Sequence, residues 1–266
     1  STKKSMMHTT KYMHQILDLS LDAYDEILSE IDTTNLVERK GIIYIWTNKN
    51  LKSRKMEIKI RNDLGIKQRL LNREEVLELE PNLSPVFDAG VIYDYAYHAR
   101  DPKEITKKLF DLFLKSGGKF KKEEVISVEQ TRYNQTQIKT NSEQFNFEKI
   151  VLACGAFSKK LTDQLGEKIP LDTERGYHVH YKKMDHLLKR PVIFLDRGFG
   201  MTPMNQGLRA VGTVELGGFD NPISKKRIDY IDNCAKELLP QLGDFQDEWL
   251  GFRPTLPDFL PVIGPS

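Results

Sequence analysis

The sequence predicts a mixed α+β and α/β fold: a mixed, largely antiparallel sheet with helices on one side, and a second region that follows an α/β pattern. Segments of helical spacing alternate with short strand-like segments along all 266 residues. The two kinds of region interleave, and no internal repeat or long linker separates them. We therefore expect two spatial domains that the chain crosses several times.

The N-terminal part combines helices with short strands. Apolar residues recur at helical spacing over residues 11–31, which predicts an amphipathic helix. Asn72 and Glu75 have the spacing of a capping box, so a helix is expected to begin at residue 73 and to end before Pro81. Further elements are expected as strands at residues 41–46 and 90–93 and as a helix at residues 48–62.

The rest of the chain is richer in strands. Asp101 followed by proline predicts the start of a helix, and Gly117-Gly118 predicts its end. A last helix is expected at residues 224–242, with Ser224 as its N-cap. Runs of β-branched and other apolar residues predict strands at residues 125–129, 137–140, 147–153, 170–181, 191–195 and 208–215.

The composition is that of an ordinary soluble protein. The 40 basic and 38 acidic residues leave a net charge of +2, which gives no basis for nucleic-acid binding. No window has the apolar length of a transmembrane helix, and the first residues lack the apolar core of a signal peptide. Cys154 and Cys234 make neither a disulfide framework nor a zinc site. These features predict a reducing, cytoplasmic location.

The most informative motif lies at the C-terminus, in Trp249-Leu-Gly-Phe-Arg-Pro-Thr-Leu-Pro-Asp-Phe-Leu-Pro-Val-Ile-Gly264. This segment resembles the G-x-R-P-x-T-P-D-x-L-P-x-I-G signature of the FAD-dependent D-amino-acid oxidase superfamily, with Leu256 as its departure. The resemblance is strongest to bacterial D-amino-acid dehydrogenases and glycine oxidases. It implies that Arg253 binds the substrate carboxylate. Arginine suits this role because its planar fork takes a carboxylate bidentately.

The G-x-G-x-x-G fingerprint that usually opens a dinucleotide-binding domain is missing from the sequence. We therefore interpret the chain as an internal fragment of a longer flavoprotein, and we expect FAD in the full-length parent but not in this chain. The resemblance divides the chain into a substrate domain (residues 1–99 and 161–250) and an incomplete, Rossmann-like FAD-binding domain (residues 100–160 and 251–266).

Three cofactor contacts follow from the resemblance. The order of motifs from Gly90 through Asp101-Pro to Val-Leu-Ala-Cys-Gly-Ala-Phe-Ser158 is similar to the central stretch of the family's FAD domain. The resemblance implies that Val125 packs on the adenine and that Ala153 and Gly155 lie near the diphosphate. A glycine at a strand end is also typical of close approach by a ligand or another backbone.

Two further segments match the family's substrate domain. Residues 170–177 fit its P-x-x-x-x-R-G-Y pattern, and residues 199–215 fit a hairpin of its substrate wall. The resemblance implies Tyr177 and Met201 as substrate contacts beside Arg253. Core packing is an equally good interpretation of Met201.

His178 and His180 are two residues apart on a predicted strand and so share one face. Two histidines could begin a metal site, but no third ligand follows at a recognisable spacing. We therefore expect no metal. Glu215, at the end of the hairpin, is interpreted as a structural hydrogen-bond partner.

The resemblance implies oxidative deamination of a small amino acid, D-configured in the matching branch, by hydride transfer from Cα to the flavin. The imine would then hydrolyse to a 2-oxo acid. No catalytic base is identified. Alternatives are a family member acting on glycine, sarcosine, hydroxyproline or glycerol 3-phosphate, and a non-catalytic ligand-binding module. The expected partners are the substrate and an electron acceptor, oxygen or a quinone, in the cytoplasm or at the cytoplasmic face of the inner membrane.

Overall fold

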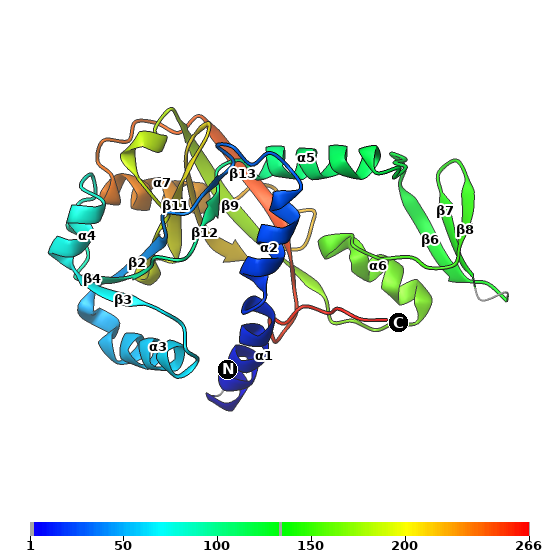
Figure 1. Ribbon diagram of the computed structural model, residues 1–266, viewed down its shortest axis with the longest axis horizontal. Coiled ribbons are helices and arrows are strands. Elements are labelled where there is room, and N and C mark those ends of the chain that lie inside the picture. The colour runs from blue at the N-terminus through cyan, green and yellow to red at the C-terminus, as the bar shows by residue number, and fades with distance from the viewer. Residues whose placement is uncertain (1–2, 133–134, 266) are drawn as a thin grey trace.

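A mixed sheet forms the centre of the protein in the computed structural model, which describes residues 3–132 and 135–265. Within these residues, neighbouring strands are antiparallel except β10 and β2, which are parallel. The predicted mixed, largely antiparallel sheet is therefore confirmed (Figure 1). Helices pack on both of its faces, however, and not on one side as expected: residues 225–238 on one face and residues 51–63 on the other. Its order is β13 (Asp247–Thr255), β9 (Asp172–Lys182), β12 (Gly207–Glu215), β11 (Phe199–Met204), β10 (Val192–Phe194), β2 (Ile42–Trp46), β4 (Ala89–Tyr93) and β3 (Arg69–Asn72).

One face of the sheet packs against α7 (Lys225–Leu238) and forms the main core. Tyr177 of β9 and Met201 of β11 point into this core, and each is 0% exposed. The helix was predicted at residues 224–242 and forms, although Ser224 makes no side-chain capping hydrogen bond. Its buried side chains recur at helical spacing: Ile228, Ile231, Cys234, Ala235 and Leu238.

The opposite face of the sheet is covered at one end. There α3 (Leu51–Asp63) packs on the side of Trp46. At the other end, Val211, Val214 and Trp249 are 42%, 45% and 54% exposed. We call this part, made by the outward-facing side chains of β9, β12 and β13, the open face.

A second, smaller sheet stands apart from the first (Figure 1). The chain reaches it through α5 (Pro102–Lys115), whose predicted cap forms: the Asp101 carboxylate accepts a hydrogen bond from the Glu104 N–H at 3.0 Å. The small sheet is antiparallel and contains β6 (Val125–Gln130), β7 (Thr136–Thr140) and β8 (Gln144–Phe147). The chain returns through η2 (Gly155–Phe157), α6 (Ser158–Thr162) and η3 (Asp163–Leu165).

The capping box predicted for α4 (Arg73–Leu79) is present. Asn72 accepts a hydrogen bond from the Glu75 N–H at 2.8 Å, and its own N–H donates to the Glu75 carboxylate at 2.7 Å. The remaining short elements are β1 (Val37–Glu38), β5 (His98–Ala99), η1 (Asn48–Asn50), η4 (Asp185–Leu187) and η5 (Leu195–Arg197). No helix among the described residues is long and apolar enough to cross a membrane.

Two predicted elements differ from the structure. The helix expected over residues 11–31 is divided into α1 (Lys3–Leu17) and α2 (Ser20–Ser29), because the Ser20 hydroxyl donates to the Leu17 carbonyl oxygen and the chain turns there. The strand expected over residues 147–153 is also wrong. Only Phe147 lies in a strand, and Val151 is 89% exposed. This apolar run has strand propensity, but no neighbouring strand in the described chain offers it backbone partners.

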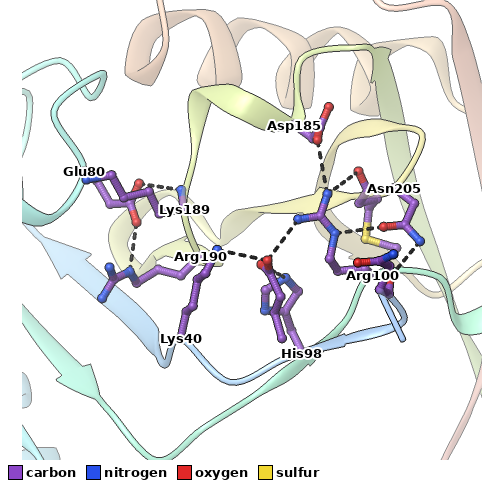
Figure 2. A network of polar contacts seen from close by, with 11 residues as sticks. Lys40, Glu80, His98, Arg100, Asp185, Lys189, Arg190 and Asn205 are labelled. Atoms are coloured by element: carbon purple, nitrogen blue, oxygen red, sulfur yellow. Dashed lines mark hydrogen bonds and ion pairs between the residues drawn. The ribbon is translucent and has the colours of Figure 1, made fainter. Parts of the chain in front are cut away.

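Charged residues fasten the place where α5 leaves the sheet (Figure 2). Arg100 contacts Glu38 at 3.3 Å and Asp185 at 3.1 Å, and it donates to the Asn205 side chain at 2.9 Å. The network therefore joins four segments that are distant in sequence. Its side chains are mostly covered, so solvent screens these contacts less than it screens surface pairs.

A second ion pair lies nearby in the same view (Figure 2). Glu80 is 0% exposed and accepts hydrogen bonds from Arg190 at 2.9 Å and from the Lys189 N–H at 2.8 Å. Burial raises the pKa of Glu80, and these donors act against that rise. The pair fixes the end of α4 to the segment before β10.

Backbone amides should differ sharply in protection between the two regions. In hydrogen exchange, we expect slow exchange at residues 208–212, which have a strand on either side, and fast exchange at residues 150–153. Comparable protection of the two segments would show that residues 150–153 have a stable backbone partner.

Replacing Arg100 by methionine should lower the free energy of unfolding by about 2 kcal/mol or more, because charge-assisted hydrogen bonds of covered side chains are lost. Urea denaturation measures this change. Arg69→Met is the matched control: Arg69 and Asp94 form an exposed pair at 3.3 Å, so the cost there should be below about 1 kcal/mol. Equal costs for the two variants would contradict the role assigned to the network.

Candidate active site

The open face is built on the pairing of β9 with β13. Gly176 lies opposite Gly251, and Glu174 lies opposite Arg253. Because side chains alternate along a strand, Gly176 and Glu174 share a face with Gly251, Arg253 and Trp249. Two glycines side by side leave a floor without side chains at this edge of the sheet.

The neighbouring side chains fold over that floor. A Cβ at Gly251 would lie 1.9 Å from the Trp249 ring, so a side chain at this position would displace that ring. The Arg253 stem crosses Gly176, with its Cδ 3.5 Å from where a Cβ would be. The Trp249 ring and the Arg253 stem therefore lie over the two glycines, next to each other on the open face.

Arg253 is the positive group of this site. Its side chain is 63% exposed, and its Nη1 lies 3.5 Å from Oε2 of Glu174. Among the described residues, Glu174 is its one charged contact. Pro254 follows on the edge strand, where its missing N–H costs no ladder hydrogen bond if that side faces away from the sheet. Because Arg253 is exposed and its one charged contact in the described chain is at 3.5 Å, its guanidinium keeps N–H donors for an added anion.

His178 and Trp249 form an aromatic wall next to the floor. Their rings stack with centroids 4.9 Å apart and an interplanar angle of 20°. Burial lowers the pKa of His178 to about 4, with further contributions from the charge of Arg209 and from His180. His178 is therefore neutral near pH 7. No group of three or more His, Cys, Asp or Glu side chains that could hold a metal is found in the described part of the chain.

Two predicted substrate contacts lie on the other face of the sheet. Tyr177 and Met201 are fully buried in the core, and the Tyr177 hydroxyl donates to the Glu215 carboxylate. The structure therefore does not bring them together with Arg253. The reason is the strand alternation: Tyr177 is one residue from Gly176, and odd positions of β9 face α7. Glu215 also pairs with Arg175 at 3.3 Å, in line with the structural role expected for it.

The predicted cofactor residues are divided between two segments. Val125 begins β6 opposite Thr140, whereas Ala153 and Gly155 are exposed at the start of η2. Gly155 has φ +57°, and nothing lies within 4 Å of a Cβ built there. Glycine is thus favoured at this turn by its backbone conformation, and no other part of the described chain approaches it closely.

Aromatic packing holds this turn against β13. Phe157 stacks on Phe219 with centroids 4.7 Å apart, and Phe252 lies 5.1 Å from Phe219. Since Phe252 precedes Arg253 in β13, the Gly155 turn and the Arg253 site lie beside the same stretch of strand.

A family model described as FAD dependent oxidoreductase matches residues 4–266. The chain belongs to this family. Among curated members, D-amino-acid oxidase of Bradyrhizobium diazoefficiens is 29% identical over 255 residues, covering 93% of this chain and 61% of that protein. D-amino acid dehydrogenase of Vibrio atlanticus is 27% identical over 269 residues, covering 95% and 62%. The chain thus spans about three-fifths of the length of these relatives.

Solved structures of the family share the fold. Glycine oxidase from Geobacillus kaustophilus superposes with a TM-score of 0.82 at 20% identity, covering 99% of this chain and 71% of that one. L-proline dehydrogenase from P. horikoshii superposes with a TM-score of 0.81 at 20% identity, covering 94% and 69%. These likenesses extend over the large sheet and over the region beyond α5.

The open face fits the ring system of the family's cofactor. Val211, Val214 and Trp249 expose apolar surface there, and no described helix packs over them. Such a flat apolar surface suits a planar aromatic ring. The phosphates of the cofactor would need backbone donors at a glycine-rich turn before a helix, and the sequence contains no G-x-G-x-x-G. The exposed apolar side chains of the open face thus fit the ring, whereas the sequence contains no glycine-rich phosphate-binding turn of this type.

Glu174 and Trp249 are the site residues that sequence reasoning missed. The signal for Trp249 was available in the alternation of strands, because it lies four residues before Arg253 and therefore shares its face. The position of Glu174 depends on the register between β9 and β13, which local sequence does not reveal.

His178 should titrate far below an ordinary histidine. We expect an NMR midpoint near pH 4 for its ring, against the usual 6.5. Between these values the unfolded chain binds more protons than the folded one, so stability decreases as the pH falls from 6.5 towards 4. Trp249→Ala should raise the midpoint by exposing the ring. A midpoint near 6.5 in the unmodified protein would contradict the burial described above.

Proposed function

We propose that the protein is, or forms the larger part of, an FAD-dependent dehydrogenase or oxidase of small amino acids. The observation that carries this proposal is Arg253, an exposed guanidinium with free donors on the open face, beside an apolar surface suited to a planar ring. The names of the relatives, D-amino-acid oxidase and D-amino acid dehydrogenase, support this substrate class and favour the D configuration.

In this proposal Arg253 holds the substrate carboxylate through two parallel hydrogen bonds. The Trp249 ring, which lies over Gly251 beside the Arg253 stem, limits the movement of the substrate to one side. The chemistry that bound FAD supplies is acceptance of a hydride from Cα, after which the substrate-derived imine is hydrolysed to a 2-oxo acid and an amine or ammonia. The chain contributes orientation: it fixes Cα relative to the ring.

The charges near Arg253 favour an amino acid over glycerol 3-phosphate. The nearest charged side chain is the carboxylate of Glu174, which would repel a phosphate dianion. Arg209, on β12, is a second cation of the open face and lies opposite His180 in the strand register. His180 is six residues from Glu174 along β9, which corresponds to about 20 Å. A phosphate at Arg253 would therefore have one positive partner and one negative neighbour.

We also propose the division into a substrate domain, containing the large sheet, and an FAD-binding domain, containing residues 100–160. The separation of the small sheet from the large one supports this division. Val125, Ala153 and Gly155 remain the proposed cofactor contacts. Residues 251–255 belong to β13 of the large sheet, so the domain boundary expected at residue 251 is better placed after Thr255.

In the full-length, FAD-loaded parent, Arg253→Met should abolish turnover of amino acids, mainly through weaker substrate binding. Loss of a bidentate contact to a charged group should cost about 2–5 kcal/mol. Arg253→Lys should restore only part of the activity, because an ammonium group is not a fork. Steady-state kinetics and ligand titration measure both effects.

Arg197→Met is a suitable control, since Arg197 forms a partly exposed pair with Glu237 at 2.6 Å on the surface. Its kinetics should match the unmodified protein. If Arg253→Met also left KM and kcat unchanged, Arg253 would not belong to the site. If the FAD-loaded protein bound amino acids without reducing the flavin, a non-catalytic ligand-binding module would be the better description.

A further inference from the structure

Glu174 is a carboxylate with unused hydrogen-bonding capacity inside the proposed substrate site. Its side chain is 13% exposed and lies opposite Arg253, with the closest approach at 3.5 Å. No hydrogen-bond donor to this carboxylate is found in the described residues. Asp172, the next acidic side chain on the same face, already accepts a hydrogen bond from the Thr173 N–H at 2.7 Å. Of these two carboxylates, Glu174 is therefore the one available to a ligand.

We propose that Glu174 accepts hydrogen bonds from the amino group of the substrate. Arg253 and Glu174 would then recognise an α-amino acid by its carboxylate and its amino group together. This inference rests on the proposed function of Arg253 and adds a second recognition residue to it.

The chemistry of the ligand matches the order of charges on the sheet. An α-amino acid carries its carboxylate and its ammonium group on one carbon, so a cation and an anion placed side by side can contact both. Arg253 has five N–H donors, and its closest approach to Glu174 is through Nη1 at 3.5 Å. A carboxylic acid without an amino group would instead bring its negative charge next to Glu174 and gain nothing from it.

Two contacts to the substrate also fix its orientation, which one contact does not. A ligand held only by its carboxylate rotates about the bond between that group and Cα. An additional contact from the amino group to Glu174 fixes this rotation, and so fixes the direction of the Cα–H bond relative to the ring. Glu174 thereby becomes both a specificity-determining and a positioning residue.

The test compares two ligands in the FAD-loaded protein. One is the D-amino acid with the highest turnover in a panel, and the other is the same molecule without its amino group. The dissociation constant of the deamino analogue is measured from the equilibrium change in flavin absorbance, and that of the amino acid from the concentration dependence of the rate of flavin reduction in anaerobic rapid mixing. Glu174→Gln should weaken the amino acid tenfold or more while leaving the deamino analogue unchanged or more tightly bound.

Glu248→Gln is the matched control. Glu248 is on β13 but pairs with Lys225 at 2.8 Å on the helix-covered side, so this variant should bind both ligands normally. Glu174→Asp, which keeps the charge, should retain more affinity for the amino acid than Glu174→Gln does.

The other outcomes separate the two proposals. If Glu174→Gln weakened both ligands equally, Glu174 would serve only to hold Arg253, and the amino-group contact would be wrong. If it weakened neither, Glu174 would lie outside the site. Arg253→Met should weaken both ligands, and its failure to weaken either would overturn the proposed function itself.

Discussion

The rest of the structure depends on the pairing of β9 with β13. This register places Gly176 beside Gly251 and Glu174 beside Arg253, so a one-residue slip would move Arg253 to the face that packs on α7. A guanidinium there would be buried among apolar side chains, which is costly without a partner. The core therefore selects the register, and the register assembles the site. Packing against α7 on one face of the sheet therefore determines the positions of the polar groups on the open face.

The connections between the two regions are of different kinds. At one end, Arg100 joins α5 to the large sheet through charged and polar contacts. At the other end, Phe157, Phe219 and Phe252 make an apolar contact between η2 and β13. Polar contacts depend on distance and angle, whereas aromatic contacts tolerate small shifts. The polar contacts of Arg100 therefore fix the direction in which α5 leaves the large sheet, and the aromatic contacts keep η2 against β13.

Local sequence was sufficient for elements whose partners are close in the chain. The capping box at Asn72 and the cap at Asp101 needed only the next few residues, and both form as predicted. The strand expected over residues 147–153 failed because strand formation needs a neighbour that propensity alone does not supply. The family resemblance implies a substrate role for Arg253, but it does not separate the two faces of the large sheet. Tyr177 and Met201 were assigned to the substrate for that reason, although they pack in the core.

Alternate residues of β9 face opposite sides of the sheet. Odd positions such as Tyr177 and Val179 fill the core, whereas even positions such as Glu174 and His178 look out from the open face. A substitution at an even position can therefore change ligand preference without disturbing the packing beneath it. A change of specificity at such a position would therefore not have to begin by weakening the protein.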